Sequence, residues 1–293
     1  MGGMAALEWP LCTPEGFVQN IIPISTSIDH DAWGISWAEA QRQCVFVDPA
    51  FEEGYYHPSP ETQPASGLAA ARMVAMLTYR SSPSFSTRFG RLPATKKEYR
   101  KPKLPNGDLV DNPASNITRR GSKMNGCVTA SGRKPDSPTF TAQSYLQYQG
   151  QKFVRRFDAN CFIHLTRKMD CHDVTRGRAP KGLDHASRNE ILSYVFSKMP
   201  QKVLVVGIES DVLFRPEQQE VLANALRNAS LAMIPSPEGH DGFLLEFGIL
   251  GPLIENHLRE RCPWIYEGPP LMETQPTVKL VEDSVFGEVE SGW

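Results

Sequence analysis

The pattern of apolar and polar residues predicts helices along most of the chain and a strand–helix alternation towards its end. Helical periodicity is found over 1–10, 31–46, 67–80, 143–157, 159–170 and 186–199. Residues 202–208 (KVLVVGI) form a continuous apolar run of strand length, which is typical of a parallel strand covered on both faces. A helix over 216–227, a strand over 230–234 and a long helix over 242–260 are predicted after it. This alternation predicts a parallel α/β sheet.

Between the two ends of the chain the composition changes. Residues 18–24 (VQNIIPI) form an apolar run that predicts a buried strand, although Pro23 has no N–H to donate to a sheet ladder. Residues 92–140 are rich in Ser, Pro, Lys, Arg, Asn and Gly and contain few large apolar side chains. Such a segment buries too little surface to offset its ordering entropy. We therefore expect a disordered insertion or a long loop there.

The predicted elements indicate one α/β domain that a helical segment interrupts. We expect the first part of the core over 1–29, a helical lid over 30–199 and the second part of the core over 200–266. The remaining residues, 267–293, are Pro-rich and acidic, and we expect a poorly ordered tail.

Composition narrows the classes of function. The 293 residues are 40% hydrophobic, which is enough for a core, and the formal net charge of −2 gives no reason to expect nucleic acid or an anionic membrane as a partner. No apolar run reaches the roughly 18–20 residues that span a bilayer, and the first residues lack the basic region of a signal peptide. We therefore expect a soluble, cytoplasmic protein. Its six cysteines are then expected to be free thiols, and none forms a CxxC pair of the kind that binds zinc.

Two polar residues follow the last two predicted strands. Asp211 comes after KVLVVGIES, and His240 comes after SLAMIPSPEG. Sites in open parallel sheets lie at the carboxyl ends of the strands. An acid after one strand and a histidine after the next match the last two members of the α/β-hydrolase triad, in which the acid orients the imidazole and the imidazole takes a proton from the nucleophile. Two other interpretations stay open: Asp211 caps the helix that begins near Pro216, and His240 is an ordinary loop residue.

The nucleophile of such a triad is a serine in a G-x-S-x-G turn between a strand and a helix. No such motif occurs in this sequence. The chain opens with Met1-Gly2-Gly3-Met4 and continues directly into a predicted helix, as the second half of the turn would. We therefore expect the chain to begin directly after the position of the serine.

The sequence resembles the homoserine O-acetyltransferase family of α/β-hydrolase-fold enzymes in its fungal form. The stretch MGGMAALEWPL is similar to the one that directly follows the nucleophilic serine in that family, where the turn resembles G-G-S-M-G-G-M. The similarity continues through NIIPISTS, AWGISWAEAQRQC, GLAAARMVAMLTYRS, RFGR, SYLQYQGQKFVRRFDANCFIHLTRKMD, VLVVGIESDVLFRPEQQ, PEGHDGFLLEF and SVFGEVESGW. It covers nearly all of the chain apart from 92–140.

The resemblance implies roles for five residues. Asp211 and His240 become the triad acid and base. Arg72, in GLAAARM, matches the family arginine that contacts the substrate carboxylate, a task that suits a planar guanidinium. Asp241 matches the residue that holds the homoserine amino group, and the backbone N–H of Met1 matches one oxyanion donor. A surface arginine and a solvated acid are the alternative interpretations of Arg72 and Asp241.

The resemblance implies an acetyltransferase that moves acetyl from acetyl-CoA to the hydroxyl of L-homoserine, in methionine biosynthesis, by a ping-pong reaction through the serine. Acetyl-CoA is then a co-substrate, and no bound cofactor or metal is implied. Because the serine is absent, we expect this chain alone to be inactive. The alternatives are transfer to another hydroxyl (serine or a cephalosporin-type alcohol) and a non-catalytic fragment that binds the intact enzyme. Family members commonly form dimers through lid helices, for which residues 143–170 are the candidates here.

Overall fold

Three clusters of buried apolar side chains form along this chain, two of them in one compact unit and the third in another. The computed structural model describes residues 1–57, 59, 62–94, 140–180 and 185–267. The first unit comprises Met1–Gly34, Thr78–Ser84 and Met169–Trp293, and the second comprises Ile35–Leu77 and Phe85–Lys168. The second unit is smaller than the expected lid over 30–199, because residues of the last lid helix pack into the core of the first unit.

The elements have the following order and bounds: α1 (Gly2–Cys12), α2 (Ala32–Phe46), η1 (Pro49–Gly54), α3 (Ala65–Tyr79), α4 (Ser82–Phe89), α6 (Thr141–Val154), α7 (Ala159–Asp170), α8 (Arg188–Ser197), β1 (Leu204–Ile208), α9 (Pro216–Ala225), β2 (Ser230–Ile234), η3 (Gly239–Asp241), α10 (Gly242–Leu245), α11 (Phe247–Arg261) and η4 (Pro263–Ile265). The helix α4 was not expected from the sequence. The Ser81 hydroxyl caps its first turn by accepting from the backbone N–H of Ser84.

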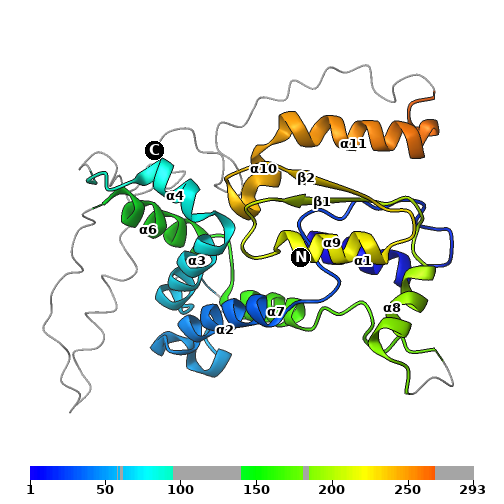
Figure 1. Cartoon of the computed structure of the whole chain (residues 1–293). Helices are drawn as coiled ribbons and strands as arrows, with labels where there is room; N and C mark the ends of the chain where they lie inside the picture. The colour runs from blue at the N-terminus through cyan, green and yellow to red at the C-terminus, as the bar shows by residue number, and fades with distance from the viewer. Residues whose placement is uncertain (58, 60–61, 95–139, 181–184, 268–293) are drawn as a thin grey trace, which may run out of the picture. The chain divides into compact units, whose positions relative to one another are not determined.

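The predicted parallel sheet is confirmed. Strands β1 and β2 pair in parallel, with a register that runs from Leu204 opposite Ser230 to Ile208 opposite Ile234. Every residue of β1 is buried, as its continuous apolar run predicts. Successive side chains of a strand point to opposite faces. Val205 accordingly lies in one core cluster with residues of α1, α8 and α9, whereas Leu204, Val206 and Ile208 lie in another with Leu250 of α11. Figure 1 shows α1 and α9 on one side of the sheet and α11 on the other.

The expectation of a strand over 18–24 was wrong. Only Ile24 pairs with the sheet, through an isolated parallel bridge to Val206. The bridge consists of two hydrogen bonds, from the N–H of Val206 to the carbonyl of Pro23 and from the N–H of Ser25 to the carbonyl of Val206. Because Pro23 has no N–H and Ser25 has a positive φ of 44°, the backbone cannot continue as a regular strand on either side of Ile24.

The expected helix over 242–260 is divided in two. Glu246 leaves the helical region, with φ −90° and ψ 48°, and separates α10 from α11. Its carboxylate accepts a hydrogen bond of 2.7 Å from the Ser236 hydroxyl. This contact ties the break to the loop after β2.

The second unit is helical. Its core consists of residues from α2, α3, α6 and α7 and from the turns between them: Val45, Tyr56, Ala65, Leu68, Ala71, Phe153, Val154, Ala159, Phe162 and Ile163. Two glycines permit close approach of its backbones. A Cβ at Gly150 of α6 would lie 2.8 Å from the carbonyl oxygen of Ala69 in α3, and one at Gly67 would lie 2.4 Å from the carbonyl oxygen of Cys44. Larger side chains at these positions would force the helices apart.

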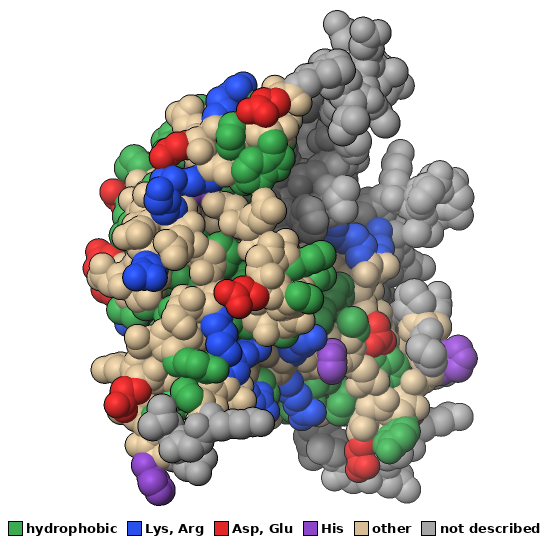
Figure 2. All heavy atoms as spheres, turned by 90° about the vertical axis from the view of Figure 1, so that its right-hand side faces the viewer, with side chains coloured by type: hydrophobic (Ala, Val, Ile, Leu, Met, Phe, Trp, Pro, Cys, Tyr) green, Lys and Arg blue, Asp and Glu red, His purple; other side chains and the backbone are tan. Residues whose placement is uncertain are grey.

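Charged side chains of both signs lie on the face of the molecule drawn in Figure 2. In Figure 2, basic and acidic side chains are interspersed with apolar ones on the described part of the face shown. Among the described residues, no helix has both the length and the apolar character needed to cross a membrane. The five cysteines in this part of the chain are free thiols. The expected insertion (92–140) and tail (267–293) lie almost entirely outside the described residues.

Candidate active site

Asp211 and His240 meet in the first unit. Asp211 lies just after β1, and His240 lies in η3, which follows β2. The Nδ1 atom of His240 is 2.7 Å from Oδ2 of Asp211, although 29 residues separate them in the sequence. Parallel neighbouring strands bring their carboxyl ends to one edge of the sheet, and this places the two loops side by side. The structure thus forms the acid–imidazole pair that the sequence predicts.

The carboxylate of Asp211 is buried, and both of its oxygens make hydrogen bonds. Besides His240, it accepts hydrogen bonds of 2.9 Å from the backbone N–H groups of Leu213 and Phe214, both on Oδ1. Its side chain has 0% exposure. These hydrogen bonds fix the orientation of the carboxylate, so that Oδ2 faces Nδ1 of the histidine. Arg215, not Asp211, occupies the N-cap position of α9, so the helix-cap interpretation of Asp211 is wrong.

The imidazole of His240 lies among aromatic rings. Phe214 and Phe243 each have a ring centroid 5.3 Å from it, and Tyr79 lies at 6.4 Å. The histidine side chain remains 18% exposed. Among the described residues, its Nε2 atom has no hydrogen-bond partner, whereas Nδ1 is bonded to Asp211. If Nδ1 carries the proton, Nε2 is the nitrogen available to accept one.

The side chain of Ser210 connects the loop after β1, which bears Asp211, to the loop after β2, which bears His240 (the histidine loop). The Ser210 hydroxyl donates to the carbonyl of Ser236 over 2.6 Å and accepts from the N–H of Gly239 over 2.8 Å. Gly239 has a φ of +72°, a conformation that favours glycine. The sequence pattern does not mark these residues, because a serine or glycine beside a strand end has no periodicity that distinguishes it.

The other sequence-predicted site residues have different surroundings. Asp241 is buried, and its Oδ2 lies 3.6 Å from Nε of Arg80 in the first unit. Arg72 belongs to α3 in the second unit, where its guanidinium lies 5.0 Å from the centre of the Phe153 ring. Met1 precedes α1 and accepts a hydrogen bond of 3.0 Å from the N–H of Ala5. The assigned roles of Arg72, Asp241 and Met1 stay predictions. No group of three or more potential metal-ligating side chains gathers within the described residues.

A parallel sheet with an acid after one strand and a hydrogen-bonded histidine after the next defines a protein of the α/β-hydrolase fold. Solved structures support this class. The chain superposes on a homoserine O-acetyltransferase from Bacillus anthracis with a TM-score of 0.62 at 16% identity, over 89% of this chain and 58% of that one. It superposes on esterase E22 with a TM-score of 0.61 at 17% identity, over 88% of this chain and 59% of that one. No family model matches the sequence.

Curated relatives narrow the class to a family. The chain is 38% identical to the homoserine O-acetyltransferase of Cryptococcus neoformans var. grubii, over 99% of this chain and 70% of the relative. It is 40% identical to the enzymes of the same name from Emericella nidulans and Schizosaccharomyces pombe, again over 99% of this chain, and over 65% and 66% of those relatives. The chain belongs to the homoserine O-acetyltransferase family, and it spans about two thirds of the length of these relatives.

Proposed function

We propose that this chain carries the acid and the base of a Ser–Asp–His acetyltransferase that moves acetyl from acetyl-CoA to the hydroxyl of L-homoserine. The observation that carries the proposal is the 2.7 Å contact between Asp211 and His240 at the tips of two parallel strands. Family membership supports the acceptor and the donor, since the relatives that are 38–40% identical are homoserine O-acetyltransferases.

In the proposed reaction, His240 acts first as a general base and then as a general acid. Its Nε2 removes the proton of the serine hydroxyl as the serine attacks the thioester, and the proton then goes to the CoA sulfur as CoA leaves. In the second half, Nε2 deprotonates the homoserine hydroxyl as it attacks the acetyl-serine, and returns the proton to the serine oxygen. Asp211 stabilises the imidazolium that exists between these transfers.

Two further residues are proposed to hold the acceptor. Arg72 would hold the carboxylate of homoserine, because its planar guanidinium can make two parallel hydrogen bonds to a carboxylate. Asp241 would attract the ammonium group. Either role would favour a charged hydroxy amino acid over a neutral alcohol. The family resemblance supports these roles.

The proposed reaction needs a serine next to His240. The sequence contains no G-x-S-x-G turn, and no described residue makes a hydrogen bond to Nε2 of His240. We therefore expect residues 1–293 by themselves to form no O-acetylhomoserine.

A hybrid protein tests the proposed function. An amino-terminal segment that ends in the serine turn typical of the family is placed ahead of Met1, and O-acetylhomoserine and released CoA are measured with acetyl-CoA and L-homoserine. The hybrid is expected to be active and chain 1–293 inactive. In the hybrid, His240→Asn is expected to lower kcat on the order of 10³-fold or more, because the base is lost.

The matched control is His164→Asn, which changes an exposed histidine of α7 and should leave kcat unchanged. L-serine in place of L-homoserine tests the acceptor. Full activity of the His240→Asn hybrid, or equal activity of chain 1–293 and the hybrid, would contradict the proposal.

A further inference from the structure

A buried guanidinium lies against the loop that bears His240. Arg80 belongs to the short segment between α3 and α4 and is buried in the first unit. Its Nη1 atom is 2.6 Å from Oε2 of Glu238, and its Nε atom is 3.6 Å from Oδ2 of Asp241. These two carboxylates belong to residues just before and just after His240. A single cation therefore contacts the histidine loop at two points on either side of the imidazole.

The segment around Arg80 makes further polar contacts with the same loop. The Ser84 hydroxyl donates to Oε2 of Glu238 over 2.5 Å and accepts from Nη1 of Arg80 over 3.3 Å. The Ser81 hydroxyl donates to the carbonyl of Pro237. Arg80, Ser81 and Ser84 thus form a polar cluster that contacts Pro237, Glu238 and Asp241 of the histidine loop. We call Arg80, Ser81 and Ser84 the arginine seat.

The backbones are also in close contact at this place. A Cβ atom at Gly239 would lie 2.5 Å from the backbone nitrogen of Ser81 and 2.8 Å from the carbonyl carbon of Arg80. Only a glycine fits there, and only a glycine readily adopts its φ of +72°. The backbone of the histidine loop therefore packs directly against the backbone of Arg80 and Ser81.

The position of the histidine loop depends on the Arg80 guanidinium, because the loop carries two carboxylates that this cation compensates. A buried charge is costly unless it is paired and hydrogen-bonded, and removing one partner leaves the others uncompensated. Glu238 is only partly exposed and Asp241 is buried, so water cannot fully replace the guanidinium. Without Arg80 the two carboxylates would be expected to move towards solvent and carry the loop with them.

The imidazole has little else to fix its direction. Among the described residues its side chain makes one hydrogen bond, from Nδ1 to Asp211, and three aromatic rings lie near it. A shift of the loop by about 1 Å would break that bond or turn Nε2 away, and displacements of that size can cost on the order of 100-fold in rate. The position of the histidine loop therefore determines whether Nδ1 of His240 stays bonded to Asp211.

We propose that Arg80 is a positioning residue for His240, which it holds against Asp211 by binding Glu238 and Asp241. The catalytic significance of this role rests on the proposed function, in which His240 is the base. The positioning itself is a property of the chain that does not require turnover and can be tested on residues 1–293.

The test observes the Nδ1 proton of His240 by nuclear magnetic resonance in chain 1–293 with isotope-labelled histidine. A proton held between Nδ1 and Asp211 gives a far-downfield signal, which is assigned by its loss in His240→Gln. Arg80→Gln is expected to abolish this signal, and Glu238→Gln is expected to weaken it. Arg80→Lys, which keeps the charge but loses the fork geometry, is expected to restore part of it.

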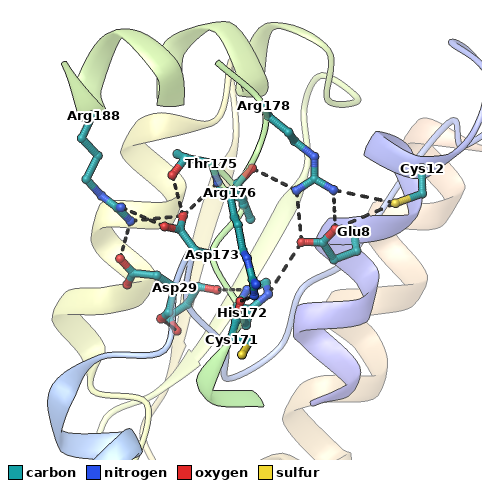
Figure 3. Close-up of polar contacts among 12 residues, drawn as sticks. Glu8, Cys12, Asp29, Cys171, His172, Asp173, Thr175, Arg176, Arg178 and Arg188 are labelled. Atoms are coloured by element: carbon teal, nitrogen blue, oxygen red, sulfur yellow. Dashed lines mark hydrogen bonds and ion pairs between the residues drawn. The ribbon is translucent and has the colours of Figure 1, made fainter. Parts of the chain in front are cut away.

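The matched control is Arg178→Gln. Arg178 also pairs with a carboxylate in the first unit, that of Glu8 of α1, at 2.6 Å (Figure 3). Its loss removes an ion pair of the same length at a different place and should leave the His240 signal in place. The ring signal of His257, whose Nε2 lies 2.9 Å from Oδ1 of Asn20, reports whether each variant is folded.

The outcomes separate the two proposals. An unchanged His240 signal in folded Arg80→Gln and Glu238→Gln would overturn the positioning role and leave the proposed function intact, as would equal loss in Arg178→Gln. If Arg80→Gln does not fold, the His240 signals of Glu238→Gln and Arg80→Lys are compared with that of the wild type instead. If the wild-type chain gives no such signal, the hydrogen bond between His240 and Asp211 is not formed, and both proposals fail.

Discussion

At the scale of single residues, several buried polar groups are held by partners that are distant in the sequence. The Tyr56 hydroxyl donates to Oδ2 of Asp158 over 2.7 Å and accepts from the backbone N–H of Asn160 over 2.9 Å. Burial, together with the neighbouring carboxylate of Asp158, raises the pKa of Tyr56 to about 12. The same principle operates at Asp211, whose hydrogen bonds hold a buried carboxylate in place.

The shifted pKa of Tyr56 predicts a loss of stability in alkali. Since the folded state binds the phenolic proton more tightly than the unfolded state, the stabilisation is fully present below about pH 10 and is lost as the pH rises towards about 12. Each pKa unit corresponds to about 1.4 kcal/mol. Urea unfolding across this range should show a decline that Tyr56→Phe reduces. Tyr55→Phe changes a side chain that is 88% exposed and should keep the wild-type decline. Equal declines of the unfolding free energy with pH in the wild type and in both variants would contradict the prediction.

At the scale of elements, helices begin where side chains satisfy their first N–H groups. Helix α8 starts with a capping box, in which the Ser187 hydroxyl accepts from the N–H of Glu190 and the Glu190 carboxylate accepts from the N–H of Ser187. The helix then buries Val195 and Phe196 in the core beneath β1. The cap therefore fixes where an apolar face begins.

Removal of the α8 cap should destabilise the first unit. Ser187→Ala leaves the N–H of Glu190 without its side-chain acceptor and is expected to lower the free energy of unfolding by about 1 kcal/mol. Ser193→Ala, at an exposed position in the middle of the same helix, should leave it unchanged or raise it by up to about 0.5 kcal/mol, because alanine is the better helix former. Denaturant unfolding measures both. A smaller loss for Ser187→Ala than for Ser193→Ala would show that the cap is not needed.

At the scale of the whole molecule, large apolar side chains are exposed on the first unit. Trp9 of α1 is 59% exposed and Phe17, in the turn after α1, is 69% exposed. Exposed apolar groups that are close along a chain are a cause of self-association in water. The formal net charge of −2 gives little electrostatic repulsion between copies of the chain.

We therefore expect chain 1–293 to self-associate and the double variant Trp9→Gln, Phe17→Gln to do so less. Sedimentation velocity over a series of concentrations measures the effect. Val47→Gln is the control, because it replaces an apolar side chain that is 74% exposed but belongs to the second unit. Equal association of the wild type and the double variant would show that these two side chains are not the cause.

The amino-acid sequence by itself determined the elements whose cause is local. The apolar run over 202–208 became β1 because a strand buried on both faces needs apolar residues at every position. The order of an acid after one strand and a histidine after the next indicated the pair, and the stretches shared with the family indicated its class. Local periodicity also predicted most helices, since burial of one helical face repeats every three to four residues.

Only the tertiary structure decided which distant residues meet. It brought Asp211 within 2.7 Å of His240, which is 29 residues away in the sequence. It also placed Arg80 against Asp241 and against Glu238, which is 158 residues away. It also limited the expected strand over 18–24 to one bridge and broke the last long helix at Glu246. The physical reason is that a buried charge or an unpaired backbone group takes its partner from whatever the fold places beside it, and a pattern along the chain does not contain that partner.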